Sequence, residues 1–326
     1  MAAMLALAGD TMLGRRVAER LTREPGAALI APEVADCIAG ADAFVLNLEC
    51  CISHRGDRFP DPGKRFFFRA PSVAARCLAD LGVDAVTLAN NHALDYGPDA
   101  LLDTLAYLRA AGIAAVGAGA DVETARAPVM LRCGGLRVRL VAFSDHPADY
   151  AAGPERPGIA FADLRGELPD WVRAAVRPGA DADLVLATPH WGPNMVAGPQ
   201  AHVRRSAAAL LGAGASLIAG HSAHIFHGVA PRVIFDLGDF LDDYIVHPKL
   251  RNDLGLLWLV EIDPHGPRAI CALPLALDYC FTRRASRAET DIIAGLLQQR
   301  CTPFGTKPHV RDGMIEVNTD AASEST

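Results

Sequence analysis

Polar side chains that can bind a metal ion follow directly on an apolar segment of this chain. Residues 83–88 have the composition and length of a buried strand, and Asn90, Asn91 and His92 come next without a charged loop between them. Each needs a contact there, because a buried polar group without a partner costs about 1–3 kcal/mol. A tight turn capped by asparagine would supply such contacts. A ligand site would also do so if other strands bring ligands to the same edge.

The same arrangement recurs at four further apolar segments, residues 4–8, 43–48, 184–188 and 216–219. The oxygen and imidazole donors at their ends are Asp10, Asn47, Glu49, His190, His221 and His224. Strand ends in an open α/β sheet meet at one edge, where ligands bind. Carboxylate, amide and imidazole donors together suit a divalent cation such as manganese, iron or zinc. A single histidine is usually packed or on the surface, so the predicted metal site depends on all five segments together.

Five further charged side chains are secondary candidates for substrate contact: Arg15, Arg16, Arg69, Asp145 and His146. The two adjacent arginines follow the first carboxylate and suit an anionic substrate, with solvation on a helix surface as the alternative. The other three lie in segments that should approach the strand ends, and we expect one of them to face the substrate.

Some residues near these motifs are expected to have ordinary structural roles. Asp95 and Tyr96 should shape the turn after His92. The same expectation holds for six histidines outside the motifs: His54, His202, His227, His247, His265 and His309.

Strand and helix patterns alternate along the chain and predict an α/β protein. Helices are expected over residues 11–21, 32–38, 71–81, 98–110, 168–176, 201–211 and 287–299, the last with a capping box from Ser286 to Glu289. Additional strands are expected at 113–116, 233–237, 256–262 and 270–277, with a hairpin at 129–132 and 138–143. No long linker interrupts the pattern. We therefore expect one domain over residues 1–319, with a C-terminal helix and strand at about 286–318 and a flexible tail at 320–326.

A polar loop at residues 54–69 contains three consecutive aromatic residues, Phe66, Phe67 and Phe68. Such a loop above strand ends is a candidate substrate lid. The equal alternative is that the aromatic rings fill the core beneath the loop.

Composition restricts the class of protein. The chain has 326 residues, 51% of them hydrophobic, and carries 31 basic against 38 acidic residues, for a net charge of -7. This balance disfavours nonspecific nucleic-acid binding. The first apolar run is too short for a membrane span of about 20 residues, and it lacks the features of a secretory signal. The 8 cysteines form no C-x-x-C motif, so we expect free thiols and a cytoplasmic protein.

Six motifs in order carry a family resemblance. These are LAGDTML, NLE, LANNHALDYG, PHWG, GHSAH and DLGDF, and the match spans about residues 5–277, with PFGT and DGMIEV towards the C-terminus. Together they resemble the bacterial capsule-synthesis CapA family, which is associated with poly-gamma-glutamate capsule. That family is in turn similar to the calcineurin-like metallophosphoesterases. The resemblance implies a four-layer fold of two mixed β-sheets sandwiched between helices, with one or two metal ions at the strand ends.

The resemblance also implies roles for individual residues. By position, Asp10 is the first metal ligand, Glu49 the bridging carboxylate and Asn91 the metal-binding amide. The remaining imidazole ligands are His190, His221 and His224. His92 is the neighbouring acid, which protonates the leaving group while a metal-bound hydroxide attacks.

Three positions differ from the phosphoesterase pattern. Met12 stands where that pattern has histidine, the spacing from His221 to His224 is one residue longer, and Glu49 replaces a shorter aspartate. One metal position is therefore expected to be weaker or absent. Asp239 stands where the capsule family more often has asparagine, so it either adds a ligand or hydrogen-bonds to one.

Three functions fit these observations. The first is a metal-dependent hydrolase acting on a phosphoester, or on an amide or peptide-like bond, in a small-molecule or oligomeric anionic substrate. The second is a non-catalytic accessory protein for synthesis or export of an anionic polymer such as poly-gamma-glutamate. The third keeps the metal in a structural role, which requires a closed shell of ligands.

Overall fold

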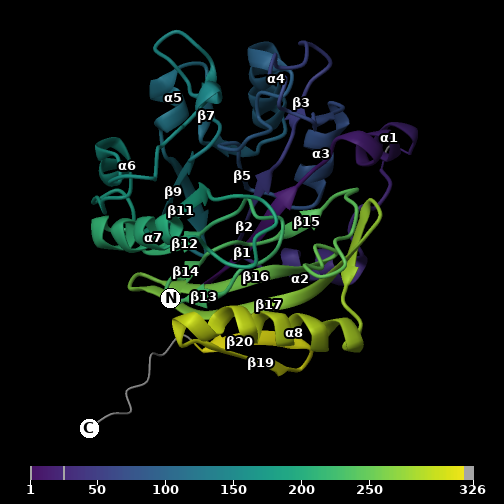
Figure 1. Ribbon diagram of the computed structural model, residues 1–326, viewed down its shortest axis with the longest axis vertical. Coiled ribbons are helices and arrows are strands. Elements are labelled where there is room, and N and C mark those ends of the chain that lie inside the picture. The colour runs from purple at the N-terminus through teal and green to yellow at the C-terminus, as the bar shows by residue number, and fades with distance from the viewer. Residues whose placement is uncertain (1, 25, 319–326) are drawn as a thin grey trace.

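Two mixed β-sheets pack face to face, and helices cover their outer faces (Figure 1). The computed structural model describes residues 2–24 and 26–318. The predicted α/β class, with two mixed sheets between helices, is confirmed. The predicted tail at 320–326 lies outside the described residues, and the single domain stays a prediction.

The larger sheet has ten strands. Its order is β19 (Lys307–Arg311), β20 (Met314–Asn318), β17 (Gly266–Asp278), β16 (Leu254–Asp263), β1 (Ala3–Thr11), β2 (Ala43–Leu48), β5 (Ala85–Thr87) and β6 (Ala114–Val116), with β15 (Asp239–Leu241) beside β1 and β18 (Phe281–Arg284) beside β17. Strands β1, β2, β5 and β6 are parallel, whereas β16, β17 and β20 add antiparallel neighbours. The carboxyl ends of β1, β2 and β5 consequently lie at one edge.

The smaller main sheet has six strands. Its order is β13 (Val229–Ala230), β14 (Val233–Ile234), β12 (Leu217–Ala219), β11 (Leu184–His190), β9 (Leu136–Ser144) and β8 (Val129–Cys133). Its central strands are parallel, and β8 and β9 form the predicted hairpin. Two short pairs are separate: β3 (Cys51–Ile52) with β4 (Arg69–Ala70), and β7 (Ala118–Gly119) with β10 (Gly158–Ile159).

The helices follow the predicted pattern closely. They are α1 (Arg15–Arg23), α2 (Pro32–Ala39), α3 (Val73–Asp80), α4 (Gly97–Ala110), α5 (Val122–Arg126), α6 (Asp170–Ala175), α7 (Ala201–Ala213) and α8 (Arg287–Cys301), with short 3-10 turns η1 (Ala148–Tyr150) and η2 (Thr302–Phe304). The predicted capping box at α8 is confirmed, since Ser286 and Glu289 each accept the other's backbone N–H. Within residues 2–24 and 26–318, no helix combines the length and apolar character needed to cross a bilayer.

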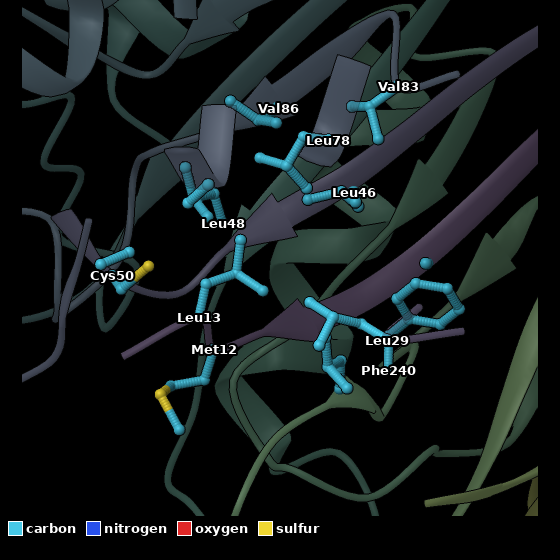
Figure 2. Close-up of a cluster of buried hydrophobic side chains, with 14 of the residues drawn as sticks. Met12, Leu13, Leu29, Leu46, Leu48, Cys50, Leu78, Val83, Val86 and Phe240 are labelled. Carbon is cyan, nitrogen blue, oxygen red and sulfur yellow. The ribbon is translucent and has the colours of Figure 1, made fainter. Parts of the chain in front are cut away.

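Apolar side chains form a core on each side of each sheet. Leu7 of β1 and Leu140 of β9 belong to the core between the sheets. The outer face of the larger sheet packs against α1 to α4, and the outer face of the smaller one against α6 and α7. Figure 2 shows part of the first outer core, with Leu46 and Phe240 inside it and Met12 at its edge, next to Leu13.

Two predicted boundaries are wrong for identifiable reasons. The helix expected from residue 11 begins at Arg15, because β1 continues through Thr11 in register with β2 and β15. The strand expected at 233–237 ends at Ile234. There the Asp236 carboxylate accepts the backbone N–H of Ala223 at 2.8 Å and that of Gly238 at 2.9 Å, which turns the chain away from the sheet.

Candidate metal centre

Side chains from the ends of both sheets meet at one edge. Asp10, near the end of β1, pairs through its backbone with Asn47 of β2 and Asp239 of β15. From the smaller sheet, His190 ends β11 and bridges to His221, two residues after β12. The register of parallel strands therefore brings together residues that are far apart in the sequence.

The potential ligand atoms form two overlapping groups that share Asp10. One group is Asp10, His190 and His221, the other is Asp10, His224 and Asp239, and within each group the ligand atoms lie within 4.8 Å of one another. Asp10 Oδ1 is 3.8 Å from His221 Nδ1, and Asp10 Oδ2 is 3.2 Å from His224 Nδ1. This arrangement offers a cation position on each side of one carboxylate.

Glu49 lies beside the first group, with its Oε2 3.9 Å from His190 Nδ1. The Asn47 amide donates to both Glu49 and Asp10, at 2.7 Å for Asp10 Oδ1. The Asn47 oxygen in turn accepts from Thr87 Oγ1 at 2.8 Å and from Asn90 Nδ2 at 2.9 Å. Asn47 and Asn90 thus orient the carboxylates.

Whether these residues fit a metal ion can be judged from their buried atoms that have no hydrogen-bond partner. Within the described ranges, five candidate ligand atoms are buried without a hydrogen-bond partner: Asp10 Oδ2, Glu49 Oε1, Asn91 Oδ1, His190 Nε2 and Asp239 Oδ2. Each such atom costs about 1–3 kcal/mol unless a ligand satisfies it. All five can coordinate a divalent cation, and none has to donate a proton to do so. The donor set therefore fits a divalent metal ion.

The loop that carries the imidazoles of His221 and His224 has a strained backbone. Ser222 has φ 123° and His224 has φ 60°, in the region where non-glycine residues are uncommon. Asp236 holds the loop through the backbone N–H of Ala223. Such strain persists where many surrounding contacts hold the backbone in place, commonly at ligand sites.

The electrostatics of the cluster follow from burial and crowded charges. Burial, followed by the Asp10 charge, raises the pKa of Glu49 well above its ordinary value, and burial also raises that of Asp239. Burial lowers the pKa of His221 to about 4 and that of His190 well below its ordinary range. Neutral imidazoles present the lone pairs that a cation requires.

His92 and Asp95 form a separate buried pair beside the cluster. His92 Nδ1 lies 2.7 Å from Asp95 Oδ2, so its Nε2 is left to face away from Asp95. Asp95 also accepts the backbone N–H of Phe68 at 2.6 Å and the Tyr150 hydroxyl at 3.2 Å, and its Oδ1 is 3.0 Å from Lys64 Nζ. Beyond shaping the turn, Asp95 thus orients the His92 ring. Nothing in the sequence pattern marks Lys64 or Tyr150 as its partners.

A cavity of about 300 Å³ reaches this pair and the metal-ligand cluster. Its lining consists of Arg15, Phe66, Phe68, His92, Asn194, Met195, His224, Tyr244, Ile245 and Asn252. Within the aromatic loop, the burial of Phe68 agrees with the core alternative, and the substrate lid stays a prediction. Phe68 is buried with its ring stacked 4.0 Å from His92, whereas Phe66 is 59% exposed at the cavity.

The secondary candidates lie in different places. Arg15 lines the cavity and pairs with the buried Asp243 at 3.1 Å. His146 lies 5.1 Å from His190 between ring centroids, and Asp145 contacts both His146 and His202. His202, expected to be ordinary, therefore belongs to this group.

Three other positions, Arg69, Met12 and Asp239, lie outside the cavity lining. Arg69 stacks on Tyr96 at 4.0 Å and lies outside the cavity lining. Met12 accepts the backbone N–H of Gly14 within the core. Asp239 lies 2.9 Å from His224 through one oxygen and, among the described residues, has no hydrogen-bond partner for the other.

The chain is similar to proteins of bacterial capsule synthesis. Residues 4–244 match the family model described as "Bacterial capsule synthesis protein PGA_cap". A "Probable polyglutamine synthesis accessory protein" of Mycobacterium tuberculosis strain CDC 1551 is 32% identical over 303 residues, covering 85% of this chain and 77% of that protein. The PGA biosynthesis protein CapA of Bacillus subtilis is 27% identical over 273 residues, covering 79% and 70%.

Among solved structures, one similar chain is the 5′-nucleotidase precursor from Thermus thermophilus. It has 16% sequence identity and a TM-score of 0.42, and the match covers 92% of this chain and 59% of that one.

Proposed function

We propose a function from one premise: this chain belongs to the bacterial capsule synthesis protein family PGA_cap. We infer that its centre binds one or two divalent metal ions and hydrolyses a phosphoester, or an amide or peptide-like bond, in an anionic substrate. The observation that carries this proposal is the set of five buried, unpartnered oxygen and nitrogen atoms at the strand ends, counted over the described residues.

The two groups around Asp10 would hold the metal. His190, His221, Glu49 and Asn91 would serve one position, and His224 with Asp239 the other. A bound divalent cation supplies Lewis-acid activation of water and of the bond to be cleaved.

His92 is the proton donor of the proposed reaction. Its Nδ1 is 2.7 Å from the Asp95 carboxylate, which stabilises the protonated ring and leaves Nε2 for the leaving group. Burial lowers the pKa of His92 below its ordinary value, and the imidazolium is correspondingly a stronger acid.

Arg15 is the candidate for binding the anionic part of the substrate. Its guanidinium lies at the cavity, where Asp243 fixes its orientation at 3.1 Å. We expect Arg15→Ala to raise KM about 10-fold, the loss of one charge-assisted hydrogen bond, while metal content stays unchanged.

A second candidate function follows from the names of the relatives. The mycobacterial relative is named a probable accessory protein of polyglutamine synthesis. A non-catalytic role in synthesis or export of an anionic polymer would require no turnover. A purely structural metal is disfavoured, because the cavity reaches His92 and His224 and leaves the ligand cluster open on that side.

The deciding experiment measures metal content and hydrolysis together. Native protein, purified without chelator, and the His221→Ala variant are compared by elemental mass spectrometry, with His309→Ala on the exposed strand β19 as the matched control. We expect about one to two equivalents of manganese, iron or zinc in the native and control proteins, and loss in His221→Ala. Phosphoesters and glutamyl amides are then screened with that metal.

Each outcome separates the candidates. Metal with turnover supports the hydrolase, and metal without turnover on either bond type favours the accessory role. Absence of metal in native protein even after reconstitution contradicts the hydrolase and leaves the accessory role.

A further inference from the structure

Tyr244 follows strand β15 and projects into the cavity beside the metal-ligand cluster. Its backbone N–H donates to Asp242 Oδ1 at 2.7 Å, which fixes the start of the side chain. Its ring meets His224 edge-on, at 5.3 Å between centroids and 82° between planes. Phe68 lies 5.8 Å away on another side. These contacts hold the phenol in one orientation.

The hydroxyl at the end of this ring is buried and has no partner among the described residues. The edge-on contact with His224 and a place in the cavity lining set this phenol beside the candidate metal centre.

A second tyrosine near the site has the opposite arrangement. The Tyr150 hydroxyl donates to Asp95 Oδ1 at 3.2 Å and so has an acceptor within the chain. The fold can thus satisfy a buried phenol in this region. The unpartnered hydroxyl of Tyr244 then calls for an acceptor that arrives with a ligand.

We propose that Tyr244 is a substrate-contacting residue whose Oη donates a hydrogen bond to an oxygen of the anionic group under attack. This inference rests on the proposed hydrolase function and adds a residue to it. An anion held at the centre would bring the missing acceptor, and the phenol would need no reorganisation to meet it.

Phe68 contacts both this donor and the proton donor. Between ring centroids, His92 lies 4.0 Å and Tyr244 5.8 Å from Phe68. All three side chains line the same cavity. His92 serves the leaving group, and Tyr244 serves an oxygen that stays on the group under attack.

The experiment measures binding of inorganic phosphate to the manganese-loaded protein by titration calorimetry. The variant Tyr244→Phe removes only the hydroxyl, and Tyr279→Phe, at a position 66% exposed, is the matched control. We expect phosphate binding about 10-fold weaker in Tyr244→Phe and unchanged in the control, with equal metal content in all three proteins. The kcat for p-nitrophenyl phosphate should fall about 100–1000-fold, as for loss of one oxyanion donor.

Three results would overturn the inference. Equal phosphate affinity in native protein and Tyr244→Phe shows that the hydroxyl does not contact the anion. Loss of metal in Tyr244→Phe makes Tyr244 a metal ligand instead. Native protein that retains metal but binds no phosphate removes the anion that Tyr244 is proposed to meet. Native protein that retains no metal overturns the proposed function itself, so the two failures are distinguishable.

Discussion

Asp10 and Asp95 are both buried carboxylates close to strand ends, yet their surroundings differ. Asp95 contacts four groups from its own chain, namely His92, Phe68 N–H, Tyr150 and Lys64. Asp10 lies with the buried carboxylates Glu49 and Asp239, and each of the three keeps an oxygen without a hydrogen-bond partner in the described ranges. The first region is internally satisfied, whereas the second has more carboxylate oxygens than its own chain satisfies. A carboxylate of the first kind holds the fold, and carboxylates of the second kind are available to a cation.

Among the variants that test this contrast, Asp95→Asn is expected to have the largest effect on turnover. The amide leaves the metal ligands in place but no longer stabilises the protonated ring of His92. We expect kcat to fall about 100-fold or more, within the range of general acid catalysis, while metal content stays constant. Steady-state kinetics with elemental analysis measures both quantities. Loss of metal in this variant would break the contrast, because Asp95 would then belong to the metal centre.

Lys64→Met should destabilise the fold without affecting a metal ligand. The Lys64 ammonium is 12% exposed and lies 3.0 Å from the fully buried Asp95 carboxylate, which the variant leaves without its cation. Removing one partner of a buried ion pair costs about 3–5 kcal/mol. Urea denaturation measures the change, with the exposed Lys249→Met as control. A loss below about 1 kcal/mol would mean that Asp95 does not depend on Lys64.

Glu49→Gln should increase the stability of the metal-free protein, whereas Lys64→Met lowers stability. Burial and the Asp10 charge raise the pKa of Glu49 above its unfolded value, so the ionised group destabilises the fold at pH 7. The neutral amide removes that penalty, and we expect chelator-treated Glu49→Gln to be about 1–2 kcal/mol more stable than native protein. Thermal unfolding with and without metal is the measurement, and native protein should gain more from added metal. Equal stability of the two metal-free proteins would contradict the charge imbalance.

The smallest effect on stability is expected at Glu289, a surface carboxylate that pairs with Arg283. The hydrogen bond from Arg283 lowers the pKa of Glu289 to about 2. A lowered folded pKa contributes stability above pH ~4.5, and this contribution is lost as the pH falls towards 2. Glu289→Gln should therefore cost about 1 kcal/mol at pH 7 and nearly nothing at pH 2. Unfolding curves at the two pH values test this, and a pH-independent difference would contradict it.

The fold was predictable where sequence and local geometry agree. Residues 43–48 were expected as a strand and form β2 with the same limits, because an apolar run ends at polar residues there. The start of α1 was not predictable, since Met12 and Leu13 are buried whether they belong to a helix or to a loop after β1. Strand β15 has only three residues and depends on pairing with β1, a contact distant in sequence.

The candidate site was predictable only for residues that end strands. Asp10, His190 and His221 follow apolar segments, and parallel pairing brings such ends together. Their role as metal ligands stays a prediction. Lys64 and Tyr244 reach the region from loops, where side-chain direction depends on the folded path and leaves no periodic signal. Asn47 and Asn91 also look alike in sequence, and only hydrogen bonding separates the orienting amide from the unpartnered one.

The position of β1 sets when the site can assemble during synthesis. The candidate ligands run from Asp10 in β1 to Asp239 in β15, and β1 also needs the later strand β16 as a neighbour. At ribosomal rates of about 5–20 residues per second, roughly 10–50 s separate the first ligand from the last. During that interval the nascent chain carries an incomplete ligand set. Metal loading would therefore be an event of the nearly finished polypeptide, and an ion captured earlier by the histidines alone would be held without its carboxylate partner from β15.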